Sequence, residues 1–152
     1  MKINSKSKWS EREIKEFLSA ATIPMRLSFM NINDEPMICS LWFKFIDDSL
    51  WSASHENSYV VNQLKNNCKV SFEVSTNEYP YKGVRGKASV ELSRLNVDDV
   101  LAGLIDKYLD RRNSRLASWL MSRVESEYIL KITPSIINSW DFSDRMEGQA
   151  SG

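Results

Sequence analysis

The chain has little cysteine and histidine, and its charges balance. Two cysteines and one histidine in 152 residues are too few for a zinc cluster or a disulfide framework. Twenty basic and twenty acidic residues cancel, so the composition gives no electrostatic reason to bind nucleic acid. No apolar run approaches the roughly 20 residues that span a bilayer, and the polar N-terminus lacks the apolar core of a signal peptide. We therefore expect a soluble, cytoplasmic protein without a nucleic-acid or membrane partner.

Familiar catalytic motifs are also absent. The sequence has no phosphate-binding P-loop, no dinucleotide-binding glycine fingerprint and no residue set that argues for a Ser-His-Asp triad. His55, the single histidine, lies in a polar Ser-His-Glu-Asn run that is typical of a solvated loop. Two classes stay open: a protein whose bound cofactor carries the chemistry, and a binding module without catalysis.

The hydrophobic pattern that is present predicts a mixture of strands and helices. Apolar residues recur at helical spacing in segments 11–21, 60–64, 97–109 and 116–124. Strand-like clustering or alternation marks segments 25–32, 37–46, 50–53, 69–75, 81–92 and 128–133, and Pro134 is expected to end the last of them. About six strands with helices at the ends and in the connections predict an α+β antiparallel barrel. We expect one domain over residues 1–152, with residues 1–8 and 147–152 flexible.

Five short pieces of the chain form a pattern by their order and spacing. They are Pro24-Met25-Arg26-Leu27-Ser28, Pro36 to Phe43, Leu50 to Ser54 with Ser58, Asn66 to Ser71, and Tyr79 to Gly86, followed by the ending Ser139-Trp140-Asp141-Phe142. With these pieces the chain resembles the pyridoxamine 5'-phosphate oxidase-like family from about residue 9 to residue 146. The resemblance implies a six-stranded antiparallel split β-barrel with flanking helices. It also implies a homodimer that holds FMN in a groove at the subunit interface.

The resemblance further implies which residues bind the cofactor. The positions that match are Arg26, Leu27, Ser28, Ser52, Ala53, Ser54, Ser58 and Trp140. Arg26 and Ser58 would hold the FMN phosphate, and residues 27–28 would run beside the isoalloxazine ring. The backbone of residues 52–54 would line the flavin, and Trp140 would reach into the partner's site.

One position departs from the family pattern. Typical members continue after the phosphate-binding serine with a basic pair, whereas this chain has Tyr59-Val60. At least one cation expected at the phosphate is therefore missing. The first hypothesis is an FMN-dependent oxidoreductase acting on a small-molecule substrate. The alternatives are a non-catalytic binding or sensing module with the same barrel, and a haem or deazaflavin binder, in which His55 is the one histidine available as an axial ligand.

Overall fold

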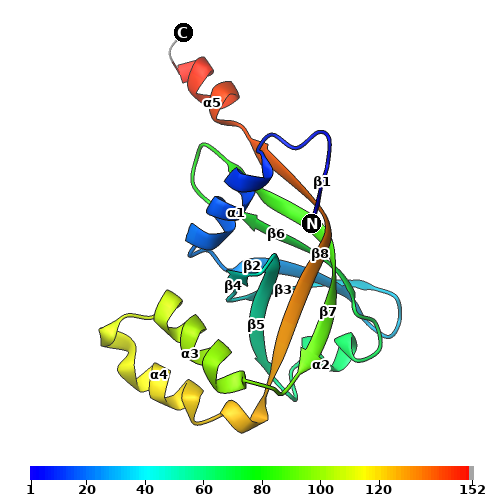
Figure 1. Ribbon diagram of the computed structural model, residues 1–152, viewed down its shortest axis with the longest axis vertical. Helices are drawn as coiled ribbons and strands as arrows, with labels where there is room; N and C mark the ends of the chain where they lie inside the picture. The colour runs from blue at the N-terminus through cyan, green and yellow to red at the C-terminus, as the bar shows by residue number, and fades with distance from the viewer. Residues whose placement is uncertain (151–152) are drawn as a thin grey trace.

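Eight strands form one strongly curved sheet in the computed structural model, which describes residues 1–150 (Figure 1). The strands are β1 (Lys2–Ile3), β2 (Met25–Met30), β3 (Pro36–Leu41), β4 (Lys44–Ile46), β5 (Ser49–His55), β6 (Lys69–Ser75), β7 (Lys82–Ser93) and β8 (Glu127–Asp141). The helices are α1 (Glu11–Ala20), α2 (Tyr59–Leu64), α3 (Val97–Tyr108), α4 (Ser114–Met121) and α5 (Ser143–Ala150). The predicted α+β antiparallel barrel is confirmed. The sheet has eight strands rather than six, because the short β1 and β4 are strands of their own.

The order of the strands explains how the sheet curls into a barrel. Neighbours follow the order β3-β2-β6-β7-β8-β5-β4, each pair antiparallel, and β1 joins β8 in parallel. β3 and β4 stand at opposite ends of this order, yet only Trp42 and Phe43 separate them in the chain. The two ends must therefore lie together. The predicted strand 37–46 was wrong as one strand, because residues 42–43 carry the chain from one edge of the sheet to the other.

Alternating side chains divide the central strands between a core face and an outer face. On β6, Val70, Phe72 and Val74 are buried, whereas Lys69 and Ser71 are exposed. Paired residues of neighbouring strands point to the same side, so the register carries this division to β2 and β7. Fully buried side chains of the core include Ile14, Leu18, Met25, Leu27, Phe43, Leu50, Leu130, Ile132 and Ile137. Each such side chain contributes about 1.5–3 kcal/mol by leaving water.

The longest strand, β8, differs from its prediction. Pro134 does not end it, because the strand continues to Asp141. The register shifts at this point: Ala88 of β7 pairs with Pro134, but Lys87 pairs with Ile136, which leaves Ser135 as an extra residue. Such a β-bulge tolerates a proline, because the ladder is already interrupted there. The Ser135 hydroxyl donates to the Lys87 carbonyl at 3.1 Å and so closes the bulge.

In Figure 1, α3 and α4 lie together at one end of the sheet, the N-terminal β1 runs beside β8, and α5 projects beyond the end of β8. α1 begins with a capping box, in which Ser10 Oγ accepts a hydrogen bond from the Glu13 amide and the Glu13 carboxylate accepts one from the Ser10 amide. Residues 1–8, which the sequence predicts to be flexible, are hydrogen-bonded to β8 through Asn4 and Lys8. α5 extends over residues 143–150, so the expected C-terminal tail is helical there, and residues 151–152 lie outside the described residues.

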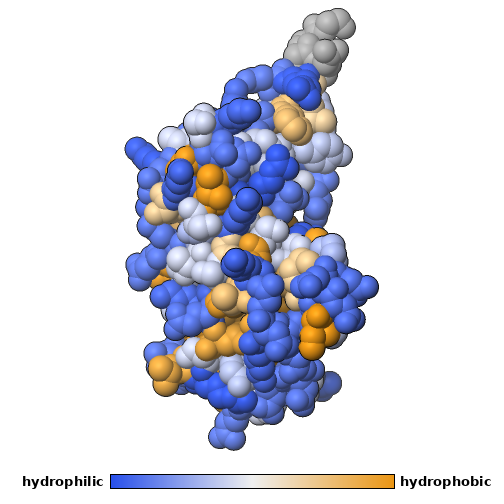
Figure 2. Space-filling model, turned by 90° about the vertical axis from the view of Figure 1, so that its right-hand side faces the viewer, coloured by the Kyte–Doolittle hydropathy of each residue, from blue (hydrophilic) through white to orange (hydrophobic). Residues whose placement is uncertain are grey.

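The surface carries apolar side chains in small groups among hydrophilic ones on the side that Figure 2 shows. Ile32 and Leu95 are 74% and 77% exposed. Scattered apolar residues of this kind are ordinary on a folded domain and require no partner. Within residues 1–150, no helix combines the length and the apolar character needed to cross a membrane.

Candidate functional site

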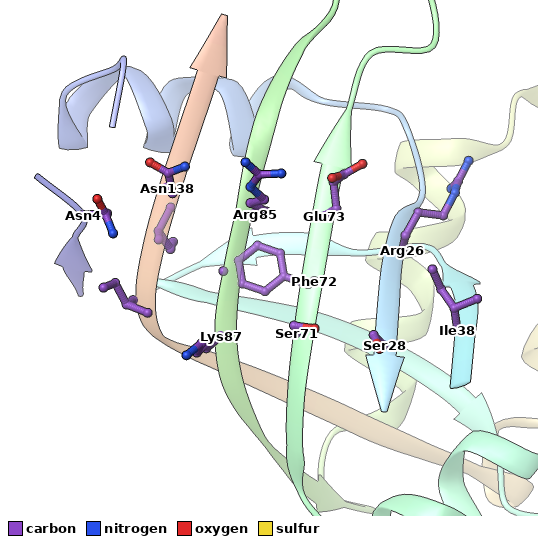
Figure 3. A pocket seen from close by; sticks show the side chains of 13 residues that line it. Asn4, Arg26, Ser28, Ile38, Ser71, Phe72, Glu73, Arg85, Lys87 and Asn138 are labelled. Atoms are coloured by element: carbon purple, nitrogen blue, oxygen red, sulfur yellow. The ribbon is translucent and has the colours of Figure 1, made fainter. Parts of the chain in front are cut away.

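An open groove of about 540 Å³ crosses the outer face of β2, β6, β7 and β8 (Figure 3). The strand register builds its polar lining in two rows. One row contains Arg26, Glu73, Arg85 and Asn138, and the next contains Ser28, Ser71 and Lys87. These residues alternate along their strands with core residues, so the same pattern that fills the barrel also lines the groove. Several side chains that are far apart in the sequence are thereby held on one rigid surface.

The groove carries more positive than negative charge. Arg26, Arg85 and Lys87 line it together with a single carboxylate, that of Glu73. Among the described side chains, none of these four has an ion-pair partner within 4.0 Å. Although the whole chain is neutral, this surface therefore favours an anionic ligand.

Local contacts hold the charged side chains of the groove in place. Arg26 Nη1 donates to the Pro24 carbonyl at 2.9 Å, and the Glu73 carboxylate accepts a hydrogen bond from Ser75 Oγ at 2.9 Å. The Arg85 guanidinium lies 4.9 Å from the ring centroid of Trp140. Contacts of this kind reduce the side-chain entropy that ligand binding would otherwise cost.

The floor of the groove borders the buried ring of Phe72 and contains an unsatisfied polar atom. Figure 3 shows the Phe72 ring between the side chains of Arg85, Glu73 and Ser71. Gly86, which pairs with Phe72, leaves room for this ring: a Cβ at Gly86 would come within 2.9 Å of it. Asn138 Oδ1 is buried and has no hydrogen-bond partner in the described part of the chain. Buried acceptors normally have a donor, so this one is suited to a ligand that offers an N–H or O–H group.

A second pocket, of about 300 Å³, lies where β3 and β5 end against α3 and α4. Ala53, Ser54 and His55 line it from β5, and Glu127 lines it from the start of β8. Ser40 links the two hollows, because it lines this pocket and is the register partner of Arg26 in the groove. The groove and the second pocket therefore meet at the β2–β3 pair, where Arg26 lines the groove and Ser40 lines the pocket.

The structure distributes the eight predicted cofactor residues over several places. Arg26 and Ser28 line the groove, whereas residues 53–54 line the second pocket. Leu27 is 0% exposed and Ser52 is 1% exposed, so both side chains face the core and only their backbones could border a ligand. One chain by itself does not bring the eight residues together.

The remaining two predicted residues have local structural roles. Ser58 is the N-cap of α2, where its hydroxyl oxygen accepts hydrogen bonds from the Val61 amide and from Ser54 Oγ, at 3.3 and 2.9 Å. This geometry agrees with the predicted helix start. Trp140 lies at the rim of the groove, against Arg85.

Sequence reasoning did not assign Glu73, Lys87, Asn138 or Glu127 to a site. The signal for Glu73 and Lys87 was present, since both occupy outward positions on alternating strands. Asn138 could not be placed, because its face depends on the bulge at Ser135. No group of three or more potential metal ligands occurs among the residues that the structure describes.

Comparison with known proteins places the fold. Neither protein-family models nor curated proteins match the sequence. A conserved hypothetical protein from Mycobacterium tuberculosis matches the structure with a TM-score of 0.75 and 19% identity, over 97% of this chain and 93% of that one. An F420 reductase matches with a TM-score of 0.67 and 16% identity, over 81% and 94%. A candidate pyridoxamine 5'-phosphate oxidase from Listeria innocua matches with a TM-score of 0.66 and 14% identity, over 85% and 96%.

This chain has the pyridoxamine 5'-phosphate oxidase-like split-barrel fold. The resemblance seen in the sequence is confirmed at the level of the fold. Other split barrels that match include an FAD-binding protein from Mesorhizobium loti and a haem storage protein from Vibrio cholerae. The names of these proteins thus include several different cofactors. Which cofactor this chain binds depends on its own residues.

Proposed function

We propose that this split barrel binds FMN and acts as an oxidoreductase on a small organic substrate. The groove between Arg26, Arg85 and Lys87 is the observation that carries the proposal, because these cations form no ion pair within 4.0 Å among the described side chains and the lining is partly apolar. Its volume of about 540 Å³ lies within the range of about 300–1,000 Å³ that is usual for cofactor and small-molecule sites. The match to an F420 reductase and an FAD-binding protein supports a flavin-type cofactor.

The residues of the groove fit the chemical parts of a flavin mononucleotide. Arg26 offers a charged donor for a phosphate, and it is already oriented by its bond to the Pro24 carbonyl. Ile38 and Ile136, which also line the groove, offer apolar surface for a planar ring. Asn138 Oδ1 needs a donor, and the flavin ring carries an N–H group. When bound, the flavin would supply hydride or electron transfer, for which the chain shows no catalytic side-chain motif of its own.

We further propose that the site is completed in a cytoplasmic homodimer. The predicted cofactor residues are divided between the groove and the second pocket of one chain. Such a division is expected if each cofactor lies between two subunits and takes residues from both. Trp140, at the rim of the groove, would then contact the cofactor held by the partner.

A deazaflavin is a second candidate, favoured by the match to an F420 reductase. It shares the planar ring and a phosphate-bearing side chain, so the groove suits it for the same reasons. Haem has less support here, because His55 lines the second pocket and its Nδ1 already accepts a hydrogen bond from the Asn57 amide at 3.1 Å. A non-catalytic module remains the hypothesis if neither flavin nor deazaflavin binds.

The test compares the affinity for FMN with the affinity for riboflavin, which lacks the phosphate. Flavin fluorescence quenching should show tighter binding of FMN to the unmodified chain. Arg26→Met should weaken FMN binding about tenfold, or about 1.4 kcal/mol, and leave riboflavin binding nearly unchanged. Arg12→Met is the matched control, because Arg12 lies exposed on α1 and pairs with Glu16, away from the groove.

Three outcomes would contradict the proposal. The first is equal affinity for FMN and riboflavin, and the second is equal loss in the Arg26 and Arg12 variants. Tight binding of a deazaflavin without FMN binding would replace FMN by the second candidate. The homodimer is tested separately by light scattering, in which a monomeric mass at micromolar concentration with flavin bound would show that one chain suffices.

A further inference from the structure

The second pocket combines one apolar wall with one charged wall. Leu101 and Leu104 of α3 and Leu120 at the end of α4 form most of the apolar side. Trp42 completes it and is held in place by Tyr108, whose ring stacks on the indole at 5.1 Å with an interplanar angle of 4°. This wall is preformed and can bury a compact apolar group.

Glu127 dominates the charged wall. Its side chain is 8% exposed, and the carboxylate oxygens are the part that keeps contact with solvent in the pocket. No described residue donates a hydrogen bond to it, and Arg123 Nη2 stays 3.9 Å from Oε1, beyond hydrogen-bonding distance. A buried carboxylate with free acceptor positions is costly unless a donor arrives. Consistently, burial raises the pKa of Glu127, while the charges of Arg123 and His55 only partly oppose the shift.

The neighbouring cations also have other contacts, which hold them away from hydrogen-bonding distance of Glu127. The Arg123 guanidinium lies 4.4 Å from the Trp119 ring centroid. Arg94, which shares a shallow hollow with Glu127, forms an ion pair with Glu56 and donates to the Glu125 carbonyl.

His55 pairs with Glu127 across β5 and β8. Its Nδ1 accepts the Asn57 amide hydrogen, so this nitrogen donates no hydrogen bond to the carboxylate. Among the described residues, Arg123 is thus the cation within 4.0 Å of the carboxylate, and its long contact leaves acceptor positions free for a ligand.

We propose that this pocket binds a small molecule with a compact apolar body and a protonated nitrogen, which the Glu127 carboxylate holds. The leucine wall and Trp42 would enclose the apolar body, and the ammonium or amidinium group would supply the donors that Glu127 lacks. The inference rests on the proposed function in one respect: it names the substrate class of that oxidoreductase. Binding itself requires no cofactor and can be measured without one.

Three probes with one body and different head groups test the proposal. They are 2-phenylethylamine, 2-phenylethanol and phenylacetate, which are cationic, neutral and anionic at pH 7.5. Titrations of the chain without added flavin, followed by NMR of the tryptophan indole signals, should show saturable binding of the amine. We expect its affinity to exceed that of the alcohol at least tenfold, which corresponds to about 1.4 kcal/mol.

Two variants locate the recognising group. Glu127→Gln should remove the preference for the amine. Glu125→Gln should retain it, because Glu125 is exposed and lies outside this pocket. If Glu127→Gln fails to fold, Arg123→Gln provides a second test of the role of Glu127 in amine binding. Removing the competing guanidinium should then tighten amine binding.

Each of four results would overturn the inference. They are absence of amine binding, equal affinity for the three probes, preference for phenylacetate, and weaker amine binding in Arg123→Gln. These failures are separate from a failure of the flavin proposal. If FMN binds and the amine does not, the inference about the second pocket is wrong but the flavin proposal stands. If the amine binds and FMN does not, the pocket is a ligand site of a protein without flavin.

Discussion

Replacing three glycines by alanine should change stability in opposite directions, because the space around each Cα differs. Gly83, Gly86 and Gly103 have no positive φ, so their backbones accept alanine and packing decides the sign. A Cβ at Gly83 would lie 2.6 Å from the Val74 carbonyl oxygen and 2.8 Å from Ser75 Cα. Both atoms belong to the backbone of β6 and cannot move away separately. A Cβ at Gly103 would touch only Lys44, at 3.5 Å, which is ordinary contact.

The expected magnitudes follow from these contacts. Gly103 lies inside α3, so Gly103→Ala should stabilise the chain by about 0.5–1 kcal/mol. Gly83→Ala should destabilise it by about 1–3 kcal/mol through overpacking. Gly86→Ala should fall between them, because one of its two close neighbours is the Phe72 ring, which can tilt more easily than a strand can move. For a chain of this size, each kcal/mol shifts Tm by about 2–4 °C.

Differential scanning calorimetry of the three variants is a suitable assay, with urea unfolding as a second measure of the free energy of unfolding. The order of Tm should be Gly103→Ala highest, then the unmodified chain, then Gly86→Ala, then Gly83→Ala. A Gly83→Ala variant as stable as the unmodified chain would refute the reasoning, because β6 and β7 could then separate without cost. A destabilised Gly103→Ala variant would show that α3 packs more tightly than the structure indicates.

Two further predictions concern a lysine and a helix cap. Burial, aided by a neighbouring lysine, lowers the pKa of Lys107 to about 8 from its usual 10.5, whereas two carboxylates raise the pKa of Lys15. Limited acetylation at pH 8 should therefore label Lys107 at least about tenfold faster than Lys15 in peptide maps, and equal labelling would contradict the shift. Because folding lowers this pKa, the half-buried charge costs stability below pH 8, and the cost fades toward pH 10.5. Ser10→Ala should lose about 1 kcal/mol in urea unfolding, because it breaks the capping box with Glu13, while Ser19→Ala on the exposed face of the helix should be nearly neutral.

Much of the fold could be predicted from local patterns in the sequence. The capping signal at Ser10 and the apolar stripe of residues 97–109 predict α1 and α3 nearly to their ends, because both signals are local. The alternation on residues 69–75 predicts β6 with its buried face. The break at residues 42–43 was missed, since Trp42 and Phe43 are as apolar as the strands that they separate, and only barrel closure turns the chain there.

The candidate site was less predictable, because it depends on register between distant strands. Arg26 could be singled out as a charge in an apolar strand, and it does line the groove. Its neighbours in the groove come from β6, β7 and β8, and no local pattern states which of their residues face it. Glu127 gave no signal at all, because a glutamate after a polar stretch is ordinarily exposed. Its burial depends on α3 and α4, whose leucines line the pocket beside it.

The bulge at Ser135 determines which residues of β8 line the groove. Along β8, Ile132 and Pro134 face the core, and a regular strand would next turn residues 136 and 138 to the core as well. The extra residue reverses this order, so that Ile137 is fully buried and Asn138 lines the groove. A one-residue change of register exchanges the two faces of a strand. Without the bulge, an isoleucine would replace the amide in the groove, and the unsatisfied Oδ1 that suits a ligand donor would lie in the core instead.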